Sequence, residues 1–418
     1  MIHPDLLLYE TINEIRAIDN HSHYPDVIDS ESYISSVIEF LTGNKKTKYK
    51  VSGGVLHPLR DSEYNDIKDI IKRLYGYKYD VIAEENKEEL ASNIRDAWRN
   101  NGTKDAYVHP LDIAGTEIVL VNNWEWITDL DKNRFKWVPL VDQYLYPIKE
   151  ANIRVRQMQY REMALETAYQ KHGGKPENFD DYLEFVGNEL RDYKKRGAVA
   201  VKIWSAFFGS LNFQKVDETR AKRIYTRYMS NTPVDESSYR EFQDYLAHHI
   251  FSLCKDLSLP VHIHTGFGLA NDKITLANSS PCNLENIVKD DDYDGLKIVL
   301  LHGGYPYVRE AGSLALMNDD VYIDSSWLSA VLPPSDLGSI FREWFAYKLE
   351  DKVLFGTDAT YTKYLTGDIL YVFCAKRARK ALSLSLTGML NDGILNRDEA
   401  VLIAEKVLRK NALNLYGF

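Results

Sequence analysis

Two histidines separated by one residue, His21 and His23, have the residue type and spacing expected of ligands to one metal ion. In an extended strand, side chains at positions i and i+2 lie on the same face, so both imidazoles can bind a cation from one side. Further polar residues each close a short apolar run later in the chain: Lys202, His264, His302 and Asp358. Nitrogen ligands combined with a carboxylate favour zinc or another divalent transition metal over calcium or magnesium. The pattern therefore predicts a metal-dependent enzyme.

The apolar runs that would position these residues are typical of buried parallel strands. We expect strands at 15–21, 116–122, 137–142, 198–203, 259–264, 297–302, 321–324 and 352–357. Helical patterns occur at 5–16 before the first strand, at 148–195 and 235–257 between strands, and at 365–416 after the last strand. Eight strands with polar groups at their carboxyl ends are what a (β/α)8 barrel needs to build a catalytic face. The predicted fold class is α/β, a (β/α)8 TIM barrel with a helical insertion after its first strand.

The segment 26–108 is too long for an ordinary connection between a strand and a helix, which takes a few residues. It is polar, with helical periodicity, and it leaves the first strand on the catalytic side. We expect an inserted lid subdomain within a single domain that spans 1–418, with Arg60 and Arg73 as contacts for an anionic substrate. The alternative is a stabilising extension or an oligomer interface.

Composition narrows the classes of partner and compartment. A net charge of −10 argues against nucleic acid or an anionic membrane as the main partner, because both bind through basic patches. Three cysteines without metal-binding spacing fit reduced thiols, and no signal peptide or apolar membrane span is visible. We expect a cytoplasmic homo-oligomer that acts on a small molecule.

Several stretches resemble the amidohydrolase superfamily and, more narrowly, the amidohydrolase-2 group, which includes the domain fused to glutamine-synthetase-like proteins. The resemblance spans the first strand to the eighth but does not cover the insertion, and its most specific part is Gly-Tyr-Pro-Tyr-x-Arg-Glu-Ala. The stretches are Ile18-Asp-Asn-His-Ser-His23, His262-Ile-His-Thr-Gly-Phe-Gly268, Leu300-Leu-His-Gly-Gly-Tyr-Pro-Tyr-Val-Arg-Glu-Ala311, Phe355-Gly-Thr-Asp-Ala359 and Asn411-Ala-Leu-Asn-Leu-Tyr416.

The resemblance implies a ligand set of His21, His23, His264 and Asp358, holding zinc or, as an alternative, manganese. A catalytic zinc ion keeps a position open for water and lowers the pKa of that water to about 7, so that hydroxide forms at neutral pH. Asp358 would also accept the proton of this water. His302 would polarise the substrate or move a proton, and its competing role is that of a direct ligand to a second metal ion. His262 would support the site by hydrogen bonding.

Lys202 allows three interpretations, because an ammonium that points into a barrel must be paired or neutralised. It can be carbamylated and bridge two metal ions, as in binuclear members of the superfamily. It can also contact the carboxylate or oxyanion of the substrate. Close relatives in the family have small or polar residues after this lysine, whereas Ile203 and Trp204 follow it here, and this difference favours substrate contact over metal bridging. It can also extend along the rim so that its charge reaches water.

Three residues are candidates for substrate binding. Arg309 could clamp a carboxylate through two parallel hydrogen bonds, although an ion pair with Glu310 is the simpler use of this side chain. Tyr305 lies on the same loop. Trp204 follows a strand end and could form a wall of the pocket.

The favoured function is hydrolysis of a C–N bond in a small, carboxylated substrate, with γ-glutamyl amides as one class suggested by the fused relatives. Non-oxidative decarboxylation and isomerisation of the uronate-isomerase type fit the same ligands, and the large insertion after the first strand favours the latter of these two. A non-enzymatic metal-binding scaffold is the remaining alternative.

Overall fold

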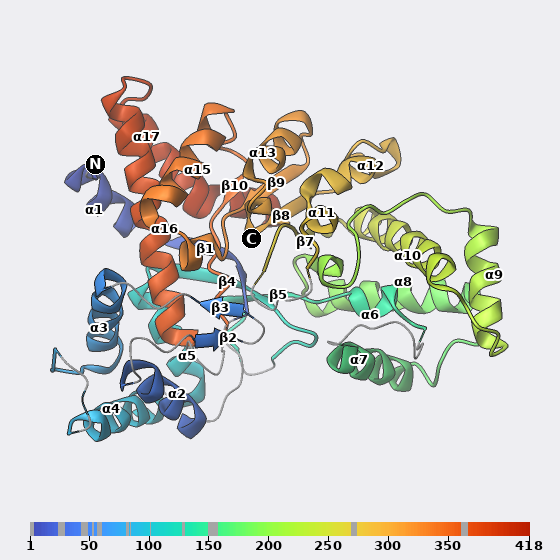
Figure 1. Cartoon of the computed structure of the whole chain (residues 1–418), viewed down its shortest axis with the longest axis horizontal. Helices are drawn as coiled ribbons and strands as arrows, with labels where there is room; N and C mark the ends of the chain where they lie inside the picture. The colour runs from blue at the N-terminus through green and yellow to red at the C-terminus, as the bar shows by residue number, and fades with distance from the viewer. Residues whose placement is uncertain are drawn as a thin grey trace.

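The structure is a computed structural model in which a central barrel of parallel strands is surrounded by helices (Figure 1). It describes residues 4–23, 30–42, 49–51, 54–56, 61–80, 83, 85–100, 102–127, 130–148, 158–268, 274–360 and 367–418. The barrel strands are β1 (Ala17–Ser22), β4 (Thr116–Asn122), β5 (Phe135–Val138), β6 (Val201–Ile203), β7 (Val261–His264), β8 (Ile298–Leu301), β9 (Val321–Asp324) and β10 (Val353–Leu354).

These strands pair in the order β1-β4-β5 in one sheet and β10-β9-β8-β7-β6 in another, all in parallel. Backbone hydrogen bonds join the two sheets at both seams. Between β5 and β6, the Lys202 N–H donates to the Pro139 carbonyl at 2.8 Å. Between β10 and β1, the Asp358 N–H donates to the His21 carbonyl at 2.8 Å. The eight strands therefore form a closed ring, which is the predicted (β/α)8 barrel.

Most strand positions are buried on both faces, because side chains pack inward into the barrel and outward against the helices. The inner cluster includes Ile18, Leu120, Val299 and Leu354, from four different strands. Such layers fill the interior of a TIM barrel, so the site must lie at one end rather than in a pore. Partly buried residues of the last helix, Tyr416 among them, pack against this cluster.

The surrounding helices follow their strands in the chain. They are α1 (Leu6–Glu14), α6 (Asp142–Leu145), α7 (Met158–Lys171), α8 (Phe179–Arg196), α9 (Glu218–Met229), α10 (Glu236–Asp256), α11 (Leu276–Ser279), α12 (Glu285–Val288), α13 (Val308–Met317), α14 (Leu328–Val331), α15 (Pro334–Ala346), α16 (Gly367–Asn391), α17 (Arg397–Glu405) and α18 (Asn411–Tyr416). Five short 3-10 or π turns complete them: Ser205–Phe207, Pro281–Leu284, Asp291–Tyr293, His302–Gly304 and Lys406–Lys410. None of the helices in the described ranges is long and apolar enough to cross a membrane.

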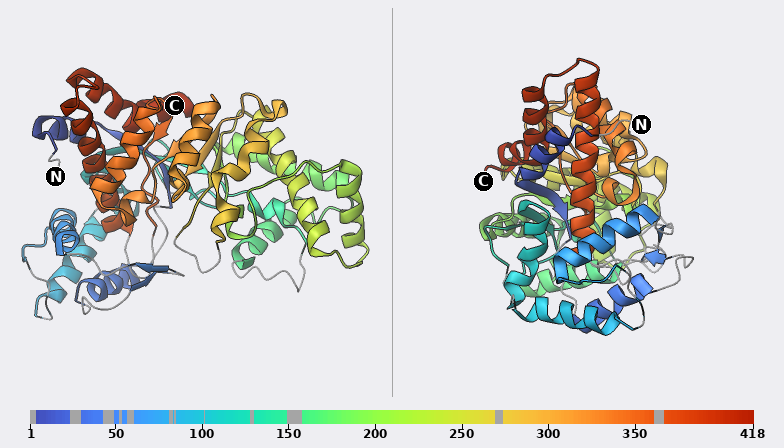
Figure 2. Two further views of the ribbon diagram at one scale, coloured as in Figure 1. Left: turned by 45° about the horizontal axis from the view of Figure 1, so that its top comes forward. Right: turned by 90° about the vertical axis from the view of Figure 1, so that its left-hand side faces the viewer.

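The segment between β1 and β4 holds the predicted helices and also a small hairpin that was not predicted. Its elements are α2 (Ser30–Thr42), β2 (Tyr49–Val51), β3 (Gly54–Leu56), α3 (Asp61–Tyr75), α4 (Lys87–Asn100) and α5 (Gly102–Ile113). Helices α3 and α5 pack against α16, the long helix that follows the last strand. This segment lies at the opposite end of the molecule from α7–α10 (Figure 2).

One predicted strand is displaced. The third was expected at 137–142, whereas β5 ends at Val138 and Asp142 already begins α6. Pro139 follows the strand directly and has no N–H to donate to a neighbouring strand, which is consistent with this early end. As a result Asp142 lies in a turn beside the barrel rim.

Candidate functional site

The carboxyl ends of the strands bring together residues that lie far apart in the sequence. His21 comes from β1, His264 ends β7, His302 follows β8 and Asp358 follows β10. His21 Nε2 lies 3.2 Å from Asp358 Oδ1, and His23 Nε2 lies 3.5 Å from the same oxygen. His302 Nε2 lies 3.0 Å from His264 Nδ1. The predicted residues therefore form one cluster at one end of the barrel.

The backbone is strained at three points around this cluster. His302 has φ 62°, Trp327 has φ 65° and Asp358 has φ 53°. The left-handed region costs a residue with a side chain roughly 1–2 kcal/mol, and such costs gather at functional sites. Each of the three follows a different barrel strand, so the surrounding structure holds their side chains in defined directions at the rim.

Three potential ligand atoms lie within 4.8 Å of one another, one each from His21, His302 and Asp358. Burial lowers the pKa of His21 well below its usual range and that of His302 to about 4, so both rings are neutral near pH 7. A neutral imidazole offers the lone pair that a metal ion requires. Both ring nitrogens of His21 and Nε2 of His264 are buried without a hydrogen bond among the described residues. This donor set fits a divalent cation.

The compact group differs from the ligand set that the family resemblance implies. His302 belongs to it, whereas the resemblance implied His264 as the ligand and gave His302 a proton-transfer role or, as the alternative, a place at a second metal ion. His264 Nδ1 contacts His302 Nε2, so the two rings are immediate neighbours. His23 lies at the rim with 31% of its side chain exposed. The geometry thus supports the coordinating role for His302, with His23 and His264 flanking it.

A buried hydrogen-bond chain supports His302 from below. Its Nδ1 lies 3.0 Å from Ser326 Oγ, and the Ser326 N–H donates to Asp324 Oδ1 at 2.8 Å. Asn20 Nδ2 donates to the other oxygen of Asp324 at 2.9 Å. The Tyr416 hydroxyl donates to Asn20 Oδ1. The chain therefore connects the rim of the barrel to the last helix.

His262 joins the same chain at its lower end, where its Nε2 lies 2.6 Å from the Tyr416 hydroxyl. It shares the strand face of His264 but lies one step deeper, as the alternation along a strand requires. Burial lowers its pKa to about 3, so the ring is neutral and acts through hydrogen bonding. This placement agrees with the supporting position expected for it.

Lys202 lies in the barrel wall, with 3% of the residue exposed. Burial lowers the pKa of its ammonium to about 8, and the charges of Asp358, Asp324 and Asp142 oppose that shift. The structure gives its ammonium no direct hydrogen bond to another described residue. A desolvated cation of this kind is suited to bind an anionic group of a ligand.

Asp142 is a site residue that the sequence analysis missed. Its carboxylate accepts hydrogen bonds from the Trp204 N–H at 2.9 Å and from Ser205 Oγ at 2.8 Å. Burial raises its pKa to about 7, while the charges of Arg161 and Lys202 act in the opposite direction. The available signal was an aspartate at the end of a predicted strand, which was assigned to the strand itself.

Aromatic rings form a wall beside His264. The Phe207 ring centroid lies 4.4 Å from that of His264, and Trp204 lies 5.7 Å from Phe207. Trp124 contacts the Trp204 ring at 5.7 Å. The predicted wall residue Trp204 is therefore part of this wall. The wall lies next to the group of His21, His23, His264, His302 and Asp358, which we call the metal-type cluster.

The two predicted contacts on the loop after β8 are placed differently. Tyr305 packs its ring on Phe267 at 5.6 Å, and Phe267 in turn contacts Trp327 near His302. Arg309 lies in α13 with 77% of its side chain exposed, and its Nε donates to Glu343 at 2.7 Å. The structure thus pairs Arg309 with Glu343 at the surface, and its clamp on a substrate carboxylate stays a prediction. Arg60 lies outside the described residues, and Arg73 lies in α3.

The chain is similar to several known proteins. The family model described as amidohydrolase matches residues 219–418. Protein fluG of Emericella nidulans is 27% identical over 210 residues, which cover 48% of this chain and 23% of fluG. The chain thus spans less than a quarter of that relative's length.

Solved structures extend the likeness to the whole fold. A protein described as a metal-dependent hydrolase from Lactobacillus casei matches with a TM-score of 0.67 at 17% identity, over 98% of this chain and 97% of its own. Uronate isomerase from Thermotoga maritima matches with a TM-score of 0.69 at 13% identity, over 98% and 96%. Glucuronate isomerase from Caulobacter crescentus matches with a TM-score of 0.65 at 14% identity, over 98% and 93%. At these identities the likeness shows a shared fold.

Proposed function

We propose that this chain is a member of the amidohydrolase superfamily and a metal-dependent hydrolase that cleaves a C–N bond in a small, carboxylated substrate. The observation that carries the proposal is the group of His21, His302 and Asp358, whose neutral imidazoles and carboxylate lie together at the carboxyl end of the barrel. Active sites of TIM-barrel enzymes are built at this end.

The residues that would hold a divalent ion are His21, His302 and Asp358, with His23 and His264 beside them. Zinc is the preferred ion for such nitrogen and oxygen donors, and manganese is the alternative. When bound, the ion supplies Lewis acidity and lowers the pKa of a water molecule. Carbamylation of Lys202 is not needed for this set, since the three ligand atoms already lie within reach of one ion.

The remaining steps use groups of the chain itself. Asp358 accepts the proton of the attacking water at a carboxylate oxygen and returns it to the leaving nitrogen. Lys202 binds the anionic group of the substrate, because its buried ammonium has no direct hydrogen bond to another described residue. The rings of Trp204 and Phe207 exclude water from the side of His264, which strengthens these electrostatic contacts.

Isomerisation of a sugar acid is the second candidate. It is favoured by structural neighbours named as uronate or glucuronate isomerases, which match 98% of this chain. The same donors could hold the hydroxy-carbonyl group of such a substrate, and Lys202 could bind its carboxylate. The two candidates require the same metal site and differ only in the bond that changes.

The test measures metal content and activity on one preparation. The protein should contain about one equivalent of zinc or a similar ion, and His21→Ala together with His23→Ala should remove it. His249→Ala on α10, whose ring contacts the Leu183 carbonyl, is the matched control and should keep it. Protein grown with ample zinc but free of metal would reject the site. A panel of γ-glutamyl amides and uronates, with zinc and with manganese, separates hydrolysis from isomerisation.

The segment 26–108 is also proposed to cover the site as a lid. This segment leaves the barrel after β1 and returns to it at β4. Its helices α3 and α5 pack on α16, the helix that follows Asp358 in the chain. Hydrogen exchange with and without an active substrate should show slower exchange in this segment. Unchanged exchange there, with protection elsewhere in the site, would favour the oligomer interface.

A further inference from the structure

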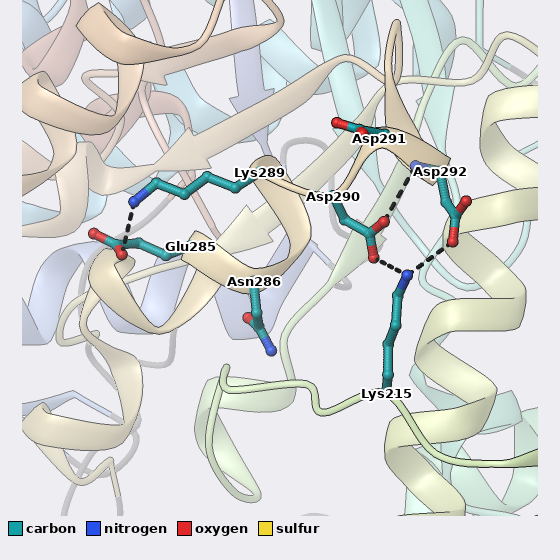
Figure 3. Close-up of a pocket in the computed structure, with 7 residues that line it drawn as sticks. All are labelled: Lys215, Glu285, Asn286, Lys289, Asp290, Asp291 and Asp292. Atoms are coloured by element: carbon teal, nitrogen blue, oxygen red, sulfur yellow. Dashed lines mark hydrogen bonds and ion pairs between the residues drawn. The ribbon is translucent and has the colours of Figure 1, made fainter.

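Two pockets lie away from the candidate active site. The larger is shallow, about 720 Å³, and is lined mainly by acidic and basic side chains (Figure 3). Lys215 lies 2.6 Å from Asp290 and 2.8 Å from Asp292, and Lys289 lies 3.0 Å from Glu285. Both of its cations are thus already paired with carboxylates of the same pocket, so it offers little to an anionic ligand.

The second pocket, of about 400 Å³, lies at the amino-terminal ends of β5 and β6, opposite the candidate active site. Its lining comes from the loop before β5, the end of α8 and the last residues of the chain. A volume of this size is in the range of sites for small molecules. We refer to it as the basal pocket.

Aromatic rings supply much of the lining of the basal pocket, including Trp126, Trp137 and Phe418. Phe418 stacks on Tyr416 with centroids 5.7 Å apart and planes at 7°. The indole N–H of Trp126 is buried without a hydrogen-bond partner among the described residues. Flat faces together with an unused donor suit a planar ligand that carries an acceptor.

Every charged side chain that lines the basal pocket is a cation, although the chain as a whole has a net charge of −10. Lys136 lies 5.3 Å from the centre of the Phe418 ring and donates to the Lys132 carbonyl. No ion pair involves Lys132 or Lys136 among the described residues. Arg196 lies 4.7 Å from the Trp137 ring and is paired with Glu125, which does not line the pocket. Two lysines therefore keep charge for a ligand.

We propose that the basal pocket is a second binding site, which takes a flat aromatic anion such as an aryl carboxylate or sulfonate. The ring of the ligand lies among Trp126, Trp137 and Phe418, and its anionic group meets Lys132 and Lys136. The site is separate from the metal-type cluster, because it lies at the other end of the barrel, and it does not depend on the reaction catalysed there.

Calorimetric titration of the full chain with naphthalene-2-sulfonate tests the proposal, with the neutral naphthalene-2-methanol as the matched probe. The sulfonate should bind in a salt-dependent manner and the alcohol should bind much more weakly. Lys132→Gln together with Lys136→Gln should weaken the sulfonate roughly fivefold to tenfold, as two partly exposed charge contacts allow. Lys215→Gln with Lys289→Gln, at the pocket of Figure 3, is the control pair and should leave binding unchanged.

Trp126→Phe keeps an aromatic ring but removes the unused N–H, so it should weaken the sulfonate less than the double lysine change. Equal binding of the neutral probe, an equal effect of the control pair, or no detectable binding would overturn the proposal. Loss of binding in His21→Ala would overturn it as well, because the sulfonate would then occupy the candidate metal site.

Discussion

Asp142 provides a test of the electrostatics beside the candidate site, through the substitution Asp142→Asn. Burial raises the pKa of this carboxyl group from 3.8 to about 7 in the folded chain. A group with a raised pKa contributes stability that is present below its unfolded value and is lost as the pH rises through its folded value. An amide does not titrate. Its oxygen can accept from the Trp204 N–H, and its NH2 can donate to Ser205 Oγ once that hydroxyl rotates.

The stability of the wild type relative to Asp142→Asn should therefore fall by up to about 4 kcal/mol between pH 4 and pH 8, since each pKa unit corresponds to about 1.4 kcal/mol. Urea unfolding of both proteins across this range measures the difference. Ser205→Ala is the control, because it removes one hydrogen-bond donor but leaves the carboxyl group to titrate, and it should follow the pH dependence of the wild type. A difference that stays constant with pH would refute the reasoning.

The other predictions concern single side chains whose surroundings differ sharply. His302→Asn should lower metal affinity by more than the roughly 10–100-fold cost of losing a supporting group, and added metal should restore part of the activity. A variant with normal metal content but a lower rate would instead assign His302 a role in proton transfer. Tyr416→Phe should lower the free energy of unfolding by about 2–4 kcal/mol, because His262 and Asn20 lose a buried partner; a change under about 0.5 kcal/mol in urea would contradict this. Arg309→Ala should change stability by no more than about 0.5 kcal/mol and leave kcat/KM unaltered, since its ion pair is exposed, and a large rise in KM would place it at the substrate after all.

The sequence located the barrel strands well, because strands buried on both faces produce apolar runs that few other elements share. The second and seventh strands were predicted at 116–122 and 321–324, which are the bounds of β4 and β9. The third failed at its end, where Pro139 cannot donate to a neighbouring strand. The hairpin β2–β3 was missed because each of its strands has only three residues, which are too few to show an alternation of apolar and polar side chains.

The candidate site was predictable as a set of residues but not as a set of contacts. Order along the chain identifies which side chains reach the carboxyl ends of the strands, since parallel strands all end at one face. It does not give their heights or directions at that face. His302 adopts φ 62° and Asp358 φ 53°, which are turns that no spacing rule anticipates. The exposed position of Arg309 was not anticipated for a related reason, because α13 begins one residue earlier and turns this side chain outward.

The preference for His302 over His264 as a ligand follows from what each ring can do with its second nitrogen. His302 Nδ1 contacts Ser326 Oγ at 3.0 Å, and Ser326 is held in turn by Asp324, so one nitrogen is fixed and the other faces the cluster. Metal-binding histidines are commonly oriented in this way, by a hydrogen bond at the nitrogen that does not bind. His264 is oriented by its neighbour in the cluster: its Nδ1 contacts His302 Nε2, and its buried Nε2 has no partner among the described residues. His302 is therefore the ring that hydrogen bonds from outside the cluster hold in one orientation, and this is the reason to prefer it as a ligand.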